Sequence, residues 1–337
     1  MGEYSKALSS YERSLEIQKI ALPPNHPDLV NSYNNVASVY DNMGEYSKAL
    51  SSYERSLEIQ KTALPPNHPD LATSYNNIAV VYYHMGEYSK ALSSYERSLE
   101  IFKIALPPNH PDLASSYNNI AVVYYHMGEY SKALPSYERS LEIFKIALPP
   151  NHPDLATSYN NIASVYDNMG EYSKALSSYE RSLEIQKTAL PPNHPDLATS
   201  YNNIGGVYSH MGEYSKALSS YERSLEIDKT ALPPNHPDLA TSYNNIGLVY
   251  YHMSEYSKAL SSYERSLEIF KIALPPNHPL LATSYNNIAM VYDNMGEYSK
   301  ALSSYERSLE IFKIALPPNH PLLASSYNNI GTECFGR

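Results

Sequence analysis

The chain repeats itself every 42 residues, and this period limits what it can fold into more than any other feature of the sequence. Each copy of the unit opens with a methionine: Met1, Met43, Met85, Met127, Met169, Met211, Met253 and Met295, with Arg337 left over. A period of this length is typical of solenoids, in which each unit stacks only on its neighbours. The 337 residues therefore set how many units stack, and not how many globular domains form.

Two amphipathic helices account for one unit, as residues 85–126 illustrate. From Tyr88 the apolar residues follow the i, i+3, i+4, i+7 spacing of a helix, and the Pro107–Pro108 pair ends it because proline has no backbone N–H to donate. A second helix starts at Pro111 and ends at Gly128, a residue that readily adopts the left-handed conformation. Each helix has one apolar stripe that a single pair cannot bury, so the pattern predicts an array of stacked helix pairs.

The spacing of large and small residues resembles the tetratricopeptide repeat. The W-x2-L-G-x2-Y, A-x3-F and P pattern of that family is matched here by Tyr75-x2-Ile78-Ala79-x2-Tyr82, Ala91-x3-Tyr95 and Pro111. The unit is roughly eight residues longer than the family's unit of about 34, and the extra residues lie between Ile101 and Pro111. With "HPDLA" before and "NNIA" inside the first helix, the unit is similar to the kinesin light chain subtype. The resemblance implies an all-α, right-handed superhelix of stacked antiparallel helix pairs.

In the phase of that family, the chain starts and ends halfway through a repeat. Residues 1–22 are then a second helix without its first, residues 27–316 form seven complete pairs, and residues 321–336 are a first helix without its second. We therefore predict a single solenoid over residues 1–337. Because its terminal helices would expose faces that capping elements usually cover, we expect a fragment or an array without its own caps.

Three positions near the end of each first helix change from copy to copy, while most of the unit stays constant. The first of them carries Ser38, Val80, Val122, Ser164, Gly206, Leu248 and Met290. The three positions are spaced i, i+3 and i+4, so they form one patch on a helix, and two asparagines lie three or four residues earlier. Drift at unconstrained surface positions is one explanation, although other predicted surface positions, such as those of Ser9 and Glu12, hardly change.

The resemblance implies another explanation, because in that family the first helices line a concave groove that binds extended peptides. An asparagine amide can pair with the backbone of a peptide whatever its sequence, and residues such as Val80, Tyr83 and His84 would contact its side chains. The predicted groove residues are Asn34, Asn35, Ser38, Asp41, Asn42, Asn76, Asn77, Val80, Tyr83, His84, Asn118, Asn119, Val122, Tyr125, His126, Asn160, Asn161, Ser164, Asp167, Asn168, Asn202, Asn203, Ser209, His210, Asn244, Asn245, Leu248, Tyr251, His252, Asn286, Asn287, Met290, Asp293 and Asn294.

Charge narrows the expected partners. The formal net charge is −10 and no basic stripe exists, which argues against nucleic acids and anionic membranes as partners. No apolar run approaches the roughly 20 residues of a membrane span. None of the groove positions is Lys or Arg and three are Asp41, Asp167 and Asp293, so we expect a neutral, aromatic or basic peptide. The single cysteine, Cys334, rules out an internal disulfide and suits a reducing, cytoplasmic setting.

Catalytic, cofactor and metal motifs are missing from the sequence. It contains no G-x-S-x-G, P-loop or H-E-x-x-H pattern, so we expect neither an enzyme nor a cofactor. The eight "NHP" histidines, from His26 to His320, occur once per unit. Packed helices lie about 8–10 Å apart, whereas zinc binds its ligands at about 2 Å. We therefore expect these histidines to cap loops and not to bind metal.

Two further features are harder to interpret. Late in the second helix, Gln60 and Thr62 are replaced together by Phe102 and Ile104 in other copies. Packing against the long loop would explain this paired change, and an accessory binding patch is the alternative. Pro135 falls inside a predicted helix, where it should cost about 3 kcal/mol or bend the axis.

The predicted function is that of a scaffold that binds extended peptide segments, resembling the cargo-binding domain of kinesin light chain. A motor or signalling complex is a candidate partner. One alternative is the sensor or oligomerisation array of a larger signalling protein of the NTPase type. A structural spacer without a ligand is another.

Overall fold

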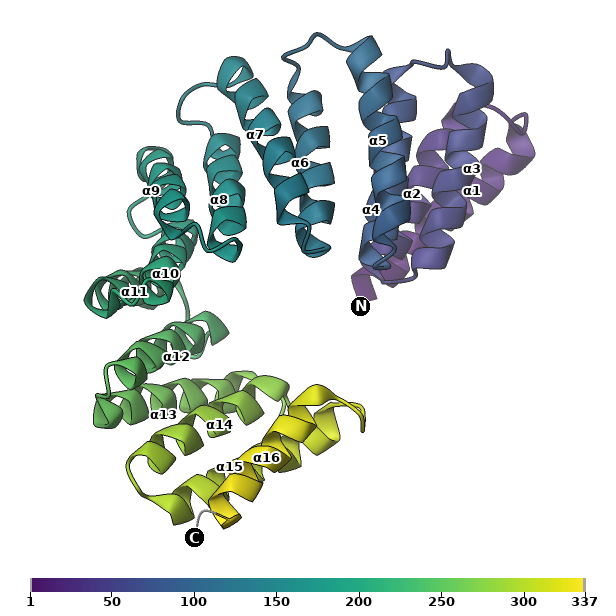
Figure 1. Ribbon diagram of the computed structural model, residues 1–337. Helices are drawn as coiled ribbons and strands as arrows, with labels where there is room; N and C mark the ends of the chain where they lie inside the picture. Colours follow the sequence, from purple (N-terminus) through teal and green to yellow (C-terminus); the bar gives the residue numbers. More distant parts are fainter. Residues whose placement is uncertain (1, 336–337) are drawn as a thin grey trace. The chain divides into compact units, whose positions relative to one another are not determined.

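The computed structural model describes residues 2–335, so Met1, Gly336 and Arg337, which the domain prediction included, lie outside the described residues. Within this range the chain forms sixteen α-helices and no strand (Figure 1). They are α1 (Gly2–Ala21), α2 (Asp28–Asn42), α3 (Tyr46–Ala63), α4 (Pro69–His84), α5 (Tyr88–Ala105), α6 (Pro111–His126), α7 (Tyr130–Ala147), α8 (Pro153–Asn168), α9 (Tyr172–Ala189), α10 (Pro195–His210), α11 (Tyr214–Ala231), α12 (Pro237–His252), α13 (Tyr256–Ala273), α14 (Pro279–Asn294), α15 (Tyr298–Ala315) and α16 (Pro321–Phe335). The all-α class and the stacked helix pairs are confirmed.

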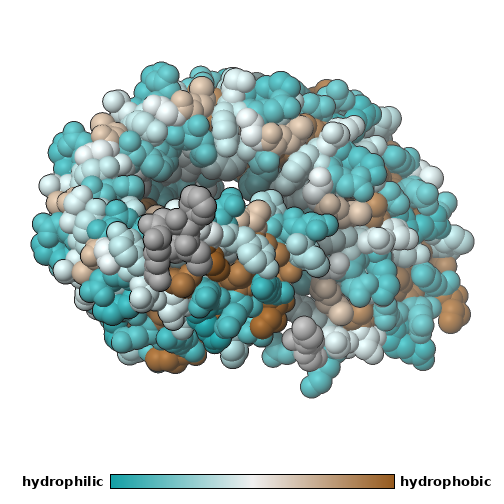
Figure 2. Space-filling model, turned by 60° about the horizontal axis from the view of Figure 1, so that its bottom comes forward, coloured by the Kyte–Doolittle hydropathy of each residue, from teal (hydrophilic) through white to brown (hydrophobic). Residues whose placement is uncertain are grey.

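The chain divides into two compact units, Met1–Met169 and Gly170–Arg337. Inside each unit every helix packs against the one before it and the one after it. The single solenoid over residues 1–337 stays a prediction. None of the described helices is both long enough and apolar enough to cross a membrane, and the face shown in Figure 2 is mostly hydrophilic, with hydrophobic residues in separate patches.

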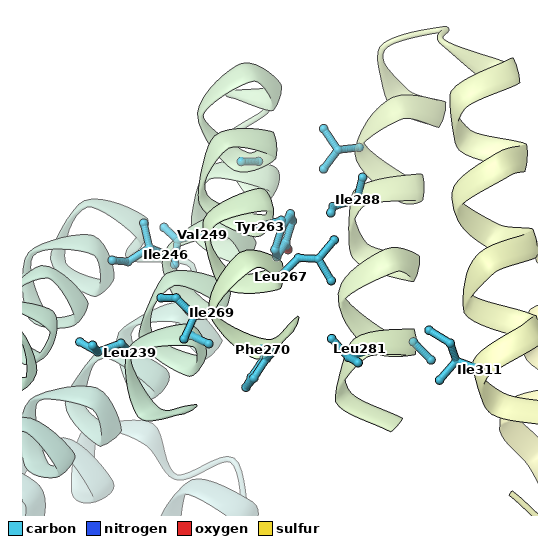
Figure 3. Close-up of a cluster of buried hydrophobic side chains, with 14 of the residues drawn as sticks. Leu239, Ile246, Val249, Tyr263, Leu267, Ile269, Phe270, Leu281, Ile288 and Ile311 are labelled. Atoms are coloured by element: carbon cyan, nitrogen blue, oxygen red, sulfur yellow. The ribbon is translucent and has the colours of Figure 1, made fainter. Parts of the chain in front are cut away.

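The core of each unit runs from one helix pair into the next. In the second unit, one buried cluster joins Leu239 and Ile246 of α12 to Phe270 of α13, Leu281 of α14 and Ile311 of α15 (Figure 3). Since apolar burial stabilises in proportion to the area removed from water, each pair depends on its neighbours for part of its stability.

A histidine lies just before the start of each even-numbered helix. In α4 the Nδ1 atom of His68 accepts a hydrogen bond from the backbone N–H of Asp70 at 3.2 Å. The same contact, at 3.2–3.3 Å, occurs at all eight "NHP" sequences from His26 to His320. Each imidazole thus satisfies one of the free N–H groups of a helix start. The loop-capping prediction is confirmed.

A residue with positive φ follows each even-numbered helix from α2 to α14. Six of these are glycines with φ between 73° and 76°, including Gly128 and Gly212. In the turn after α12, Ser254 takes this place at φ 59°. The left-handed conformation crowds the Cβ atom of any residue other than glycine, so this turn carries strain that the other turns lack.

The residues that change together late in the odd-numbered helices have different environments. Phe102 and Phe144 are buried, whereas Ile104 and Ile146, two residues later, are each 67% exposed. Packing therefore accounts for the phenylalanines and not for the isoleucines, so the paired change has no common packing cause.

Restoring serine at position 135 should stabilise the first unit. Helix α7 continues through the exposed Pro135, which cannot donate a hydrogen bond to the preceding turn. Every other copy has serine there. We expect Pro135→Ser to raise the free energy of unfolding by up to about 3 kcal/mol, measured by urea denaturation followed by circular dichroism. The reverse change in another copy, Ser177→Pro, should destabilise by a similar amount, and an unchanged denaturation midpoint for Pro135→Ser would contradict the prediction.

Glycine at position 254 should relieve the strained turn. We expect Ser254→Gly to stabilise the second unit by about 1 kcal/mol, because the left-handed conformation costs about 1–2 kcal/mol for a residue with a Cβ atom. Thermal unfolding measures this as a higher Tm. The matched control is Gly212→Ser, which introduces the same strain one copy earlier and should lower Tm. Equal Tm values for all three chains would show that the turn tolerates serine without strain.

Candidate functional site

All the predicted groove residues lie on even-numbered helices, α2 to α14, and each is exposed or half-buried. On α4, for example, Asn76, Val80, Tyr83 and His84 follow one another at helical spacing along one face. Hydrogen bonds join this face to the same face of the next even-numbered helix within each unit. In each unit the site is therefore a strip of surface that crosses successive even-numbered helices.

The asparagines form a ladder within each unit. In each rung, the Nδ2 atom of the second asparagine of one copy donates to the Oδ1 atom of the first asparagine of the preceding copy. The rungs are Asn119 to Asn76 (3.0 Å), Asn161 to Asn118 (3.0 Å), Asn245 to Asn202 (2.9 Å), Asn287 to Asn244 (2.9 Å) and Asn329 to Asn286 (3.0 Å). Asn329, on α16, extends the ladder beyond the predicted residues.

Each rung uses only part of the two amides that form it. A rung uses one N–H of the second asparagine and the oxygen of the first. The Oδ1 atom of the second asparagine and the amide hydrogens of the first take no part in the rung. On α2 the arrangement differs, because the Oδ1 atom of Asn34 is buried and has no hydrogen-bond partner in the described part of the chain.

The variable residues at the ends of the even-numbered helices contact one another across copies. His84 Nδ1 lies 2.9 Å from Asp41 Oδ1, and the hydroxyl of Tyr83 lies 3.2 Å from both ring nitrogens of His126. Two other copies have an equivalent of the contact between Tyr83 and His126. Asn168 Nδ2 donates to the Tyr125 hydroxyl at 3.0 Å, and Asn294 Nδ2 donates to the Tyr251 hydroxyl at 2.9 Å. Some of the residues that vary between copies therefore form hydrogen bonds with a variable residue of the neighbouring copy.

Aromatic rings widen this part of the strip. Tyr83 packs against Tyr88 with ring centroids 5.9 Å apart, and His252 stacks on Tyr214 at 5.6 Å with an interplanar angle of 7°. Burial, and then the neighbouring Tyr88, raise the pKa of Tyr83. The strip thus combines neutral amides with aromatic surface, a composition suited to binding a protein segment.

Small cavities adjoin the asparagine ladder, and the sequence did not reveal them. Each lies between two even-numbered helices and includes one residue of the odd-numbered helix between them. The cavity between α4 and α6 has a volume of about 210 Å³ and is lined by Thr73, Asn76, Phe102, Asp112, Ser115, Ser116 and Asn119. The next, of about 180 Å³, is lined by Ser115, Asn118, Asn119, Phe144, Asp154, Thr157 and Ser158.

The second unit has a comparable cavity between α10 and α12. Its volume is about 210 Å³ and its lining is Pro195, Thr199, Asn202, Ser224, Asp228, Asp238, Thr241 and Ser242. Asp228 occupies the position that Phe102 and Phe144 occupy in the first unit. The change of residue type at this position was the one available sequence signal, and it was interpreted above as packing or as an accessory patch.

Another cavity, of about 580 Å³, involves none of the predicted residues. It lies among α1, α2 and α3 and includes Glu12 and Tyr40. The Tyr40 hydroxyl donates to Glu12 Oε1 at 2.5 Å, and this bond, with burial and the charge of Glu12, raises the pKa of Tyr40 to about 12. Among residues 2–335, no group of three or more His, Cys, Asp or Glu side chains is arranged to hold a metal ion.

Comparison with solved structures places this arrangement among repeat proteins of the same kind. A kinesin light chain-like protein with nearly identical TPR-like repeats from Podosopora anserina is 25% identical, with a TM-score of 0.55 over 61% of this chain and 98% of that chain. BtubC (BKLC) from P. vanneervenii is 24% identical, with a TM-score of 0.57 over 68% of this chain and 90% of that chain.

A third similar structure belongs to a different kind of protein. It is a signal transduction ATPase with a tetratricopeptide repeat sensor from Pyrococcus horikoshii, 18% identical, with a TM-score of 0.65. The match covers 98% of this chain and 50% of that one. No curated protein sequence matches the chain.

The family model described as tetratricopeptide repeat matches the sequence in overlapping segments: residues 1–62, 43–104, 70–146, 112–188, 154–230, 196–272, 238–314 and 280–337. Members of this family are generally protein–protein interaction scaffolds, and no catalytic family is indicated. With its period, its stacked helix pairs and these matches, the chain belongs to the tetratricopeptide repeat family.

Proposed function

We propose that the chain is a non-catalytic scaffold that binds an extended segment of a partner protein along the asparagine ladder. The observation that carries the proposal is the ladder itself, whose rungs repeat on successive even-numbered helices within each unit and use only part of the amides that form them. A peptide backbone offers donors and acceptors along its length, so a row of amides can pair with it regardless of its sequence. Aromatic residues at one end of the strip and the cavities at the other would then contact its side chains.

The charge of the strip favours a neutral, aromatic or basic segment. No lysine or arginine occurs among the predicted groove residues, and the chain as a whole carries a formal net charge of −10. An acidic segment would meet repulsion without a compensating cation. The likeness to kinesin light chain-like repeats supports an adaptor role, and we propose a cytoplasmic motor or signalling complex as its setting.

A second candidate function is the sensor array of a larger signalling protein. It is favoured by the fold shared with the repeat sensor of the Pyrococcus horikoshii ATPase, half of whose length this chain spans. In that role the bound segment would change the association state of the protein. Light scattering with and without bound peptide distinguishes the two, because a simple scaffold keeps its molar mass per chain.

Replacing four asparagines of the first unit should remove peptide binding. The experiment pans a random peptide library on the immobilised chain and measures the affinity of enriched peptides by fluorescence polarisation. We expect the variant with Asn118, Asn119, Asn160 and Asn161 changed to Ala to bind them at least about tenfold more weakly, since each lost hydrogen bond contributes roughly 1 kcal/mol. Circular dichroism should show unchanged helix content.

The matched control changes exposed residues on the odd-numbered helices. Glu96→Ala with Glu138→Ala removes two exposed side chains from α5 and α7, outside the strip. This variant should bind the enriched peptides as the unchanged chain does. Equal affinity of the asparagine variant, or a library without enriched peptides, would refute the proposed function.

A further inference from the structure

The cavity between α10 and α12 differs from its counterparts by a carboxylate. At the same place in the repeat the other copies carry Gln18, Gln60, Phe102, Phe144, Gln186, Phe270 and Phe312, and only this copy carries an acid, Asp228. Asp228 lines the cavity together with Asn202, a residue of the asparagine ladder. The change therefore alters a cavity that opens beside the proposed binding strip.

Asp228 is held less tightly than the glutamines that it replaces. Where the copy has glutamine, a serine of the next helix donates to its Oε1 atom at 2.5–2.6 Å, as Ser74 does to Gln60 and Ser200 to Gln186. Aspartate is one methylene shorter, and its Oδ2 atom lies 3.4 Å from the hydroxyl of Ser242. The carboxylate is thus set back from the serine that should stabilise it.

The carboxylate is nevertheless buried. Only 6% of Asp228 is exposed, its hydrogen bond from Ser242 is long at 3.4 Å, and among the described residues it forms no ion pair. Burial, and then the charge of Asp238, raise the pKa of Asp228, while the hydrogen bond from Ser242 and the charge of His236 act in the opposite direction. A buried carboxylate without an ion-pair partner is unfavourable, and a cation beside it removes much of that penalty.

We propose that this cavity binds an ammonium or guanidinium group, with Asp228 as its anchor. When the group is the side chain of a lysine or arginine in the bound segment, the inference rests on the proposed function. It then adds a preference for a basic residue at one position of that segment. A single small amine or guanidine from solution would present the same chemistry.

The rest of the lining suits such a group. An ammonium has three N–H donors and a guanidinium has five, so a cation that meets Asp228 needs further oxygen acceptors. The side chains of Thr199 and Thr241 supply hydroxyl oxygens in the lining, and Asp238 adds a second carboxylate. The Asp238 side chain is 67% exposed, so it can attract a cation from solvent before the cation reaches the buried Asp228.

The cavities of the first unit provide an internal contrast. There Phe102 or Phe144 takes the place of the carboxylate, and the serine of the next helix turns to a backbone carbonyl of its own helix instead, as Ser116 does to Asp112 at 2.8 Å. These cavities offer an aromatic surface to a side chain and no buried anion. Different repeats of the array would therefore bind different kinds of side chain.

The test removes the charge of Asp228 in two ways. Asp228→Asn keeps the shape and deletes the charge, and Asp228→Gln installs the residue of the Gln60 and Gln186 copies, which the fold already accommodates. Glu222→Gln is the control, because it deletes one exposed charge from the same helix outside the cavity. Circular dichroism verifies that all three chains remain helical.

The first arm of the experiment uses small probes. Saturation-transfer difference NMR measures the binding of n-butylammonium and n-butylguanidinium, with 1-butanol as the uncharged probe. We expect both cations to bind the unchanged chain and the Glu222→Gln control, and to bind both Asp228 variants about tenfold more weakly, as loss of a charged hydrogen-bond partner predicts. Equal cation binding by all four chains would overturn the inference.

The second arm uses the peptide library described above. We expect peptides enriched on the unchanged chain to carry Lys or Arg at one fixed position, and this preference to disappear on either Asp228 variant. If cations bind through Asp228 but no peptide is enriched, the ligand is a free cation, and the proposed function fails while the cavity inference stands. A third outcome would be that peptide binding requires the asparagines, while neither the peptides nor the small cations bind differently when Asp228 is replaced. In that case only the cavity inference fails, and the proposed function stands.

Discussion

The whole structure depends on one constraint, which is that a helix pair of 42 residues cannot cover its own apolar face. Leu239, Phe270 and Ile311 belong to three different copies of the unit and yet lie in one buried cluster, because each copy completes the core of the next (Figure 3). This requirement restricts which residues can occupy the interface between copies. It also places equivalent positions of successive copies close together. A side chain on the strip therefore contacts the residue 43 positions later, as Asp41 contacts His84.

The asparagine ladder follows from that placement. A residue and the residue 43 positions later are adjacent in space, and two consecutive asparagines per copy are enough to link Asn119 to Asn76 and Asn161 to Asn118. The rungs hold the amides in fixed orientations before a ligand arrives, which lowers the entropic cost of binding. The same adjacency joins Asp41 to His84 and Tyr83 to His126. Variation at these positions is therefore constrained by the neighbour as well as by any ligand.

Much of the fold could be predicted from the sequence because its determinants are local. The prolines and glycines at the ends of the helices act through their own backbone geometry. The histidine caps need only a residue two positions away, as His68 caps the N–H of Asp70. The partners of Tyr83 and Asn76 could not be predicted, because these contacts depend on how one copy stacks on the next. The cavity beside Asn202 was missed for the same reason, since Asp228, Thr199 and Thr241 come from three helices.

Asp228 shows how a nearly uniform array can acquire a local preference. The serine opposite is the same residue in the copies that carry glutamine, phenylalanine or aspartate at this position, so the side chain at this position changes the chemistry of the cavity. A glutamine is satisfied by the serine at 2.5–2.6 Å, a phenylalanine needs no polar partner, and the aspartate is left with one distant hydroxyl at 3.4 Å. A constant row of amides would give affinity for any extended backbone. Single substitutions beneath it would then decide which side chains are accepted at each repeat, and the acid at position 228 would favour a cation.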